Sequence, residues 1–247
     1  MTFNKDIFYL ILPIHILSII LIYNFNIWLF LIGWFIIGCI GQEIGLHRYF
    51  GHKAFKLSMW QENILATISI FPAQGGPLWW ASAHAHHHKH SDTKLDIHSP
   101  IQGKWFAFLG WYFVPSPVKI IRRDLLKNKY LKYIHLHHKK IYWITVLPLL
   151  FIPEIVLNLF LLPAVISFWG VNLVNWLCHD NIFGYKNFDT KDNSKNLPIL
   201  SLFTWGLSLH ENHHWDQTNP SHSVKWWEID IAGEIIKKWI ILKHQNI

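Results

Sequence analysis

Two long runs with almost no Asp, Glu, Lys or Arg constrain this chain more than any other feature. Residues 7–42 contain no Asp, Glu, Lys or Arg, and residues 141–178 contain only Glu154. At a helical rise of ~1.5 Å per residue, each run extends roughly 55 Å, nearly twice the ~30 Å hydrocarbon core of a bilayer. We therefore expect an all-α integral membrane protein in which each run forms a hairpin of two spans. The first turn is predicted at residues 24–26 and the second between Pro153 and Pro163.

The basic residues predict how these four spans are oriented. The chain has 22 Lys and Arg and a net charge of +7, but none of the 22 lies between Lys5 and Arg48 or between Lys140 and Lys186. Both hairpin turns are thus free of positive charge, and the positive-inside rule places both termini and the central segment on the cytoplasmic face. The net charge then indicates attraction to anionic headgroups, and no nucleic-acid-binding motif is present.

The remaining composition indicates a single membrane domain over residues 1–247. Cys39 and Cys178 lie inside apolar runs and form neither a disulfide framework nor a CxxC zinc motif. The first apolar segment has no small-residue cleavage site after it, so we expect a retained span rather than a signal peptide.

The chain has 18 histidines, and four short motifs near the predicted span ends carry ten of them. The motifs are HRYFGH (47–52), HAHHH (84–88), NWLCH (175–179) and HENHH (210–214). The candidate ligands in them are His47, His52, His84, His87, His88, His179, His210, His213 and His214. Positions i, i+3 and i+4 share a helix face, so the second and fourth motifs each present three imidazoles in one direction. Nine imidazoles exceed the needs of one metal ion but suit two, and imidazole binds iron, zinc or copper.

These motifs resemble the histidine boxes of the integral-membrane fatty acid desaturases. The sequence around these boxes is similar to that of bacterial members of the stearoyl-type delta-9 group. The similar segments are SDT followed by Asp96 and His98 after the second box, and WWEID (226–230) after the last. The resemblance extends from about residue 40 to 232. It implies a four-helix membrane stem with a cytosolic helical cap, in a bacterial inner membrane.

The resemblance also implies a non-haem di-iron centre that uses O₂ to remove two hydrogens from an acyl chain. Carried over by position, one iron takes five histidines: His47, His52, His84, His88 and His213. The other takes His87, His179, His210 and His214, with Asn175 holding a water on it. Since the chain has no GxGxxG motif and no fused haem domain, the family implies an external electron donor, a ferredoxin or a b-type cytochrome with its reductase.

The acyl carrier is suggested by residues that differ from the animal acyl-CoA desaturases. Those enzymes have an Arg-Asp pair where this chain has Ser82 and Ala83, an Arg-Lys pair at Pro115 and Ser116, and a Trp at Asn172. The loss of these CoA contacts removes the bidentate geometry with which Arg binds phosphate. We therefore favour an acyl group on a membrane lipid or on acyl carrier protein, with acyl-CoA as the alternative.

Two other enzyme classes fit parts of the pattern. His210, Glu211 and His214 form HExxH, the motif of zinc peptidases, although one zinc would leave most of the clustered histidines unexplained. Membrane hydroxylases and alkane monooxygenases use similar boxes and insert oxygen instead of removing a second hydrogen.

The other histidines are expected to bind no metal. His86 and His90 should point away from the ligand direction, whereas Asp96 and His98 could hydrogen-bond ligating imidazoles. The trio at 135, 137 and 138 ends a basic stretch, 119–140, that reads as an amphipathic helix on the membrane surface. His15 is expected to be a packed helix residue, and no partner is predicted for His222 or His244.

Residues 64–74 form an apolar segment that is too short to span a membrane, and we expect a re-entrant or interfacial segment there. The tryptophan pairs at positions 79–80 and 226–227 are candidates for lining an acyl channel or for anchoring the protein at the membrane interface.

Overall fold

The computed structural model describes residues 6–118 and 122–241, and over these residues the backbone is helical, with isolated bridge pairs in place of strands. This confirms the expected all-helical class. The elements that contain the two apolar runs are η1 (Ile7–Ile11), α1 (Leu12–Ile20), η2 (Ile22–Asn24), α2 (Ile27–Trp34), η3 (Phe35–Gly51), α6 (Lys129–Leu149), α7 (Pro153–Val156), η7 (Leu157–Leu161) and α8 (Leu162–Leu177). The others are α3 (Met59–Ile68), α4 (Pro77–His90), η4 (Pro100–Gln102), α5 (Lys104–Phe108), η5 (Gly110–Phe113), η6 (Leu125–Lys127), α9 (Pro198–Phe203), α10 (His210–Trp215), α11 (Ile231–Ile235) and η8 (Ile236–Ile241).

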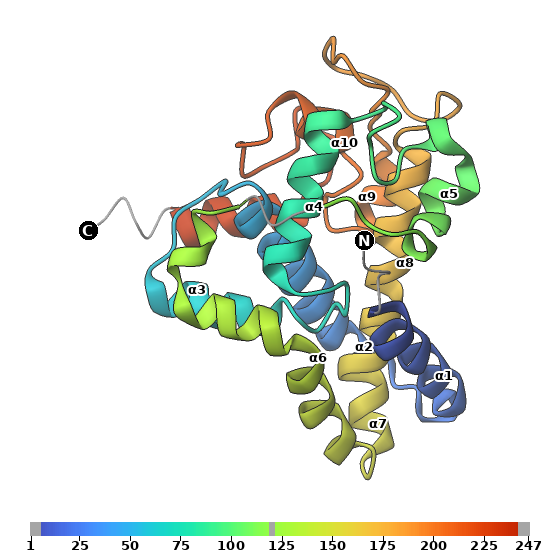
Figure 1. Ribbon diagram of the computed structural model, residues 1–247, viewed down its shortest axis with the longest axis vertical. Coiled ribbons are helices and arrows are strands. Elements are labelled where there is room, and N and C mark those ends of the chain that lie inside the picture. Colours follow the sequence, from blue (N-terminus) through green and yellow to red (C-terminus); the bar gives the residue numbers. More distant parts are fainter. Residues whose placement is uncertain (1–5, 119–121, 242–247) are drawn as a thin grey trace.

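Two continuous helices form the centre of the molecule. One comprises α2 and η3, and the other comprises α7, η7 and α8; each is 25 residues long and apolar enough to cross a membrane. A shorter apolar helix, Ile7–Ile20, lies beside them (Figure 1). In Figure 1, α1, α2 and α7 occupy the lower half of the molecule, and α4, α5, α9 and α10 occupy the upper half.

The break in the first apolar run lies where the sequence predicts it. Phe25 and Asn26 have extended backbone between η2 and α2. The side chain of Asn26 accepts hydrogen bonds from the backbone N–H groups of Trp28 and Leu29, which have no intrahelical partner. This N-cap starts the second helix of the run.

The predicted position of the second turn was wrong. The helix α6 ends at Leu149, residues 150–152 form the turn, and Pro153 is the first residue of α7. A proline in the first turn of a helix lacks only an N–H that has no helical partner, so Pro153 starts the helix instead of breaking it. Pro163 follows the π-type turn η7, and the helix continues through it, as such local adjustments allow.

Polar contacts join the first turn to the start of the helix that follows the second turn, at the lower end of the molecule. The backbone N–H of Asn26 donates to Asn158 Oδ1 at 3.0 Å, and its side-chain amide donates to Glu154 Oε1 at 2.7 Å. Asn158 in turn donates to the carbonyl of Asn24 at 2.8 Å. Nearby, a Cβ on Gly33 would lie 2.4 Å from the carbonyl oxygen of Asn158, so only glycine permits this approach of α2 to η7. These contacts fix the two hairpins relative to each other.

The basic stretch differs from its prediction as a separate surface helix. Residues 129–149 form one unbroken helix, α6, which contains both the basic segment and the start of the second apolar run, while residues 119–121 lie outside the described part. Asn128 caps α6 by accepting from the N–H of Leu131. In Figure 1, α6 first runs beside α3 and then descends toward α7.

Residues 64–74 form the second half of α3 and the turn after it. Ser69 donates to the carbonyl of Gly41 in η3 at 3.1 Å, and the segment leads directly into α4. A core of buried apolar residues joins η3, α3, α4 and α6. This core holds α4, which carries the second histidine box, against the end of η3, which carries the first.

Candidate metal centre

Four segments that are far apart in sequence bring the histidine boxes together. His47 lies in the last turn of η3, and His52 directly follows that helix. The second box lies on α4, His179 follows the end of α8, and the last box lies on α10, which adjoins α4 in the upper half of Figure 1.

Five imidazoles form a first cluster through their Nε2 atoms. The Nε2–Nε2 distances are 3.1 Å between His47 and His213, 2.8 Å between His213 and His88, and 3.1 Å between His88 and His84. His52 Nε2 lies 2.6 Å from His84 Nε2. The five rings therefore point their Nε2 atoms into one small volume.

Four imidazoles form a second cluster beside the first. His210 Nε2 lies 3.0 Å from His179 Nε2 and 3.1 Å from His214 Nε2. One ring nitrogen of His87 completes the group, in which all four ligand atoms lie within 4.8 Å of one another. Asn175, one helical turn before His179, lines a cavity together with His87 and His210.

The histidines of the box on α4 are shared between the two clusters, and so are those of the box on α10. The spacing in the sequence did not decide which histidine belongs to which cluster. At ~100° per residue, positions i and i+4 differ by about 40°, whereas i+3 turns about 60° the other way. His84 and His88 thus enter the first cluster, and His87 enters the second. On α10 the division is reversed, with His213 in the first cluster and the two flanking ligands in the second.

Carboxylates fix four of these rings from outside. Nδ1 of His179 contacts Asp92 Oδ2 at 2.9 Å, and Nδ1 of His214 contacts Asp192 Oδ2 at 2.6 Å. Nδ1 of His87 lies 3.0 Å from both oxygens of Asp96, and Nδ1 of His47 lies 3.0 Å from Glu43 Oε1. Such bonds set the tautomer and direction of metal-binding imidazoles. Only Asp96 was expected from the sequence, although Glu43 is recognisable four residues before His47 on the same helix.

The resulting protonation states test whether the residues fit a metal ion. A carboxylate at Nδ1 makes that nitrogen the N–H of a neutral ring, so Nε2 of His179 and of His214 carries a lone pair. Both lone pairs face Nε2 of His210, which holds one hydrogen at most. Hydrogen bonds among neutral rings leave one of these contacts unsatisfied, whereas a cation accepts every lone pair. Nε2 of His87 is also buried without a hydrogen-bond partner, so this donor set fits a metal ion.

Burial favours the neutral, metal-binding form of most of these rings. It lowers the pKa of His84, His88, His210 and His213 well below the ordinary value. Burial also lowers the pKa of His214 to about 4, against the opposing effect of Asp192. His87 differs: burial acts to lower its pKa, but Asp96, together with Asp92 and Asp192, raises the pKa above its ordinary value.

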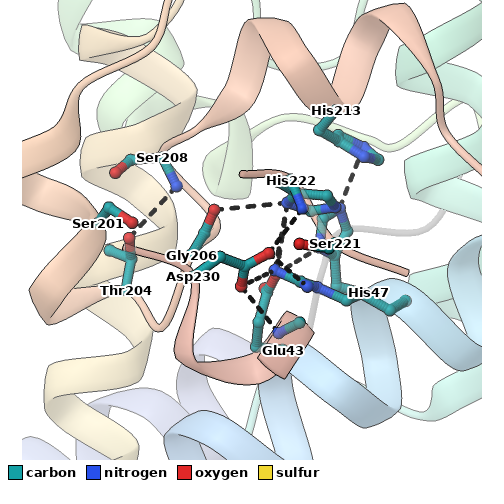
Figure 2. A network of polar contacts seen from close by, with 12 residues as sticks. Glu43, His47, Ser201, Thr204, Gly206, Ser208, His213, Ser221, His222 and Asp230 are labelled. Atoms are coloured by element: carbon teal, nitrogen blue, oxygen red, sulfur yellow. Dashed lines mark hydrogen bonds and ion pairs between the residues drawn. The ribbon is translucent and has the colours of Figure 1, made fainter. Parts of the chain in front are cut away.

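A buried ionic network borders the first cluster (Figure 2). Arg48 donates to both oxygens of Asp230, at 2.8 and 2.9 Å, and to Glu43 Oε1 at 2.9 Å. His222 accepts from Arg48 at 3.2 Å through Nδ1 and donates its backbone N–H to Asp230 at 2.6 Å. The network joins the C-terminal segment to Glu43 and therefore to His47. His222, for which no partner was predicted, lies in its centre; burial and Arg48 lower its pKa to about 3.

Most of the other histidines lie where the sequence predicts. His86 bonds the carbonyl of Leu95, and His15 bonds the carbonyl of Ile11 and accepts from Trp169. His98 was expected to hydrogen-bond a ligating imidazole and does not: its ring lies tilted by 34° beside that of His87, with centroids 4.3 Å apart, and its Nδ1 is buried without a hydrogen-bond partner. The histidines of α6 were expected to lie at the membrane surface, which was wrong in part. His137 is exposed, but His138 is buried and pairs with Asp6 at 3.2 Å. His244 lies outside the described residues.

Glu211 does not take the role that HExxH requires. Its carboxylate accepts from the backbone N–H groups of Asn187 and Phe188, at 2.9 and 2.8 Å, and from Asn196 Nδ2 at 2.9 Å. It is fully buried in these structural contacts. A general base must instead face a metal-bound water, so the geometry does not support a zinc peptidase.

A cavity opens beside the clusters. Aromatic rings form much of its lining, including Trp79, Trp80 and Trp111, and its polar side includes His84, His87 and His210. One of the aromatic pairs noted in the sequence thus lines a cavity. The other does not line it: Trp226 is 91% exposed and Trp227 is 45% exposed.

Comparison with known proteins gives one consistent result. The family model described as fatty acid desaturase matches residues 26–244. An acyl-CoA 5-desaturase of Anemone leveillei is 34% identical over 95% of this chain and 76% of its own length. Delta-9 acyl-lipid desaturase 2 of Arabidopsis thaliana is 32% identical over 83% of this chain and 69% of its own length. An sn-1 stearoyl-lipid 9-desaturase of Anabaena variabilis is 30% identical over 85% and 78%, respectively.

Proposed function

The chain belongs to the fatty acid desaturase family, and we propose that it uses O₂ and two iron ions to introduce a cis double bond, at delta-9, into a saturated acyl chain. The family makes it an oxidoreductase that acts on fatty acyl chains. The observation that carries the finer proposal is the convergence of nine imidazoles into two adjacent clusters.

In this proposal each cluster holds one iron. The first is held by His47, His52, His84, His88 and His213, and the second by His87, His179, His210 and His214. Asn175 supports a water at the second site. The iron pair supplies the oxidising chemistry with O₂, and electrons come from an external donor, a ferredoxin or a b-type cytochrome.

The protein's own residues position the acyl chain. The aromatic lining of the cavity provides apolar contact for methylene groups, while His84 of the first cluster and His87 and His210 of the second form its polar side. An apolar wall of this kind favours the acyl chain over water. The carboxylates behind the imidazoles hold the rings in the direction that ligation needs.

We propose that the two apolar runs form four spans with the histidine clusters on the cytoplasmic side. Large apolar side chains are exposed around the lower half, including Tyr23 at 97%, Phe151 at 92% and Trp28 at 72%. An exposed apolar surface of this kind fits lipid better than water. A cysteine placed at Asn24 should react with an impermeant reagent only from the non-cytoplasmic side, whereas one at Asp189 should react only from the cytosol. Labelling of both from the same side would contradict the four-span arrangement.

The structure favours a lipid or acyl carrier protein over CoA as acyl carrier. Ser82 is fully buried and donates to the carbonyl of Leu78 within α4, and Ala83 is buried beside it. Asn172 is also fully buried, donates to the carbonyl of Phe168 and accepts from Trp111. None of these positions offers a cation to a CoA phosphate. The names of the relatives cover both acyl-CoA and acyl-lipid substrates and do not decide the question.

Purified, iron-loaded enzyme with a reduced ferredoxin or cytochrome tests function and carrier together. Stearoyl groups would be offered on phospholipid, acyl carrier protein and CoA in parallel, with gas chromatography of the products. We expect a cis-9 monoene from the phospholipid or the carrier protein and less from CoA. A hydroxylated product would identify a monooxygenase, and efficient turnover of the CoA ester alone would contradict the carrier proposal.

A further inference from the structure

The outer partners of the two histidine clusters are unequal. In the second cluster, three of the four rings have a carboxylate at Nδ1, namely those bonded to Asp92, Asp96 and Asp192. In the first cluster only His47 has one, Glu43. Nδ1 of His88 and of His213 is buried there without any hydrogen-bond partner.

The single carboxylate of the first cluster is also largely neutralised. Glu43 Oε1 accepts from Arg48 at 2.9 Å, and Arg48 is itself 1% exposed. In contrast, the carboxylate of Asp192 contacts His214 and the backbone N–H and hydroxyl of Ser194, none of which carries a permanent positive charge. The nearby Lys186 ammonium donates to the backbone carbonyl of Asp192, at 2.6 Å, and not to its carboxylate. Asp96 likewise contacts His87 and the N–H groups of residues 92 and 98.

This difference has an electronic consequence for bound ions. A carboxylate that accepts the Nδ1 hydrogen raises the basicity of the imidazole and therefore its donation to a metal. Its negative charge also stabilises the higher charge of an oxidised ion in a site of low dielectric. Both effects are concentrated at the second cluster.

We propose that Asp92, Asp96 and Asp192 make the two metal sites electronically unequal, so that the second site loses an electron first and holds the ferric ion of a half-oxidised pair. The inference rests on the proposed function, because it requires an iron in each cluster. It assigns these three aspartates as positioning and tuning residues. Both clusters contribute to the cavity lining, the first through His84 and the second through His87 and His210. The more readily oxidised site would therefore be one of two that adjoin the acyl chain.

The test is a one-electron oxidation of the loaded protein. Enzyme reconstituted anaerobically with ⁵⁷Fe(II) receives one equivalent of ferricyanide, which takes one electron from one Fe(II) and becomes ferrocyanide. Mössbauer spectroscopy then separates the ferric from the ferrous ion. The variants are Asp192→Asn and Asp96→Asn, and the matched control is Glu43→Gln at the first cluster.

We expect the two aspartate variants to alter the ferric component and to move the first oxidation to a higher potential. Each should also weaken the binding of one of the two irons by about 10- to 100-fold, measured by competition with a chelator. Glu43→Gln should alter the ferrous component and leave the first oxidation unchanged. Asp192→Glu keeps the charge and should restore the ferric component, which a purely structural effect would not predict.

Some outcomes would overturn the inference. If Glu43→Gln shifts the first oxidation and the aspartate variants do not, the first site is oxidised first. Ferric character shared equally between both sites would also contradict it. If the wild-type chain binds two irons and either of these two results is obtained, only this inference is contradicted. If the wild-type chain does not bind two irons, the proposed function is contradicted. Circular dichroism of the metal-free variants shows that each is folded before it is compared.

Discussion

The His87→Ala enzyme is expected to form no unsaturated product and to hold one iron fewer than the wild type. His87 is one of the four imidazoles in the second cluster, and its removal leaves three ligands at that site. His213→Ala should have the same effect at the first cluster, where its Nε2 contacts those of His47 and His88. Product is measured by gas chromatography and iron by elemental mass spectrometry.

His137→Ala is the matched control for these two variants. It removes an imidazole of the same size, but one that is exposed on α6 and contacts the ring of Tyr133 instead of either cluster. Most of the activity and both irons should remain. An equal loss in all three variants would contradict the choice of ligands, and an active wild type with one zinc and no iron would contradict the di-iron proposal.

Arg48→Ala is expected to produce the largest loss of stability outside the clusters. The side chain is 1% exposed and pairs with both Glu43 and Asp230, which are equally buried. Its removal leaves two carboxylates without a counter-charge, and breaking a buried ion pair in this way costs about 3–5 kcal/mol of unfolding free energy. Denaturant unfolding of metal-free protein in detergent, followed by tryptophan fluorescence, measures the change without a contribution from iron.

Arg123→Ala provides the control, because Arg123 is exposed and a surface change of this kind usually alters stability by no more than ~0.5 kcal/mol. Replacing the whole network, as Arg48→Met with Glu43→Gln and Asp230→Asn, should cost less than Arg48→Ala alone, since no unpaired charge remains. A single Arg48→Ala variant as stable as Arg123→Ala would show that the network does not hold the C-terminal segment in place.

The chain's helical class and the residues of the candidate site were predictable from local sequence. Long uncharged runs have few alternatives to apolar helices, and the break at residues 24–26 follows from the capping ability of Asn26. The spacing HxxHH likewise places imidazoles on one side of a helix whatever the rest of the chain does. Glu43 was also within reach, since it lies one turn before His47.

The second turn, the extent of the basic helix and the carboxylate partners of the histidines depended on tertiary contacts. Proline was a poor guide to the second turn, because it starts a helix as readily as it ends one, and the position of the break at 150–152 depends on how α6 and α7 pack. The basic stretch continued into the apolar run as one helix, since no capping or breaking residue separates them at 140–141. The histidine partners of Asp92 and Asp192 could not be read from the sequence, because each aspartate is far from the histidine it contacts, by 87 and 22 residues. Asp92 belongs to the SDT motif, but that motif does not indicate a contact with His179.

The sequence by itself determined which side chains are available: nine imidazoles near the ends of apolar helices, and the helix faces on which they lie. The tertiary structure decided how they are shared, because the packing of η3 on α4 and the placement of α10 select which Nε2 atoms meet within ~3 Å, the range of direct polar contact. It also decided which carboxylate stands behind each ring and joined Arg48 to Asp230 across 182 positions of the chain. Helical periodicity is local and can be read from spacing, whereas contacts between distant segments depend on the packing of the whole core.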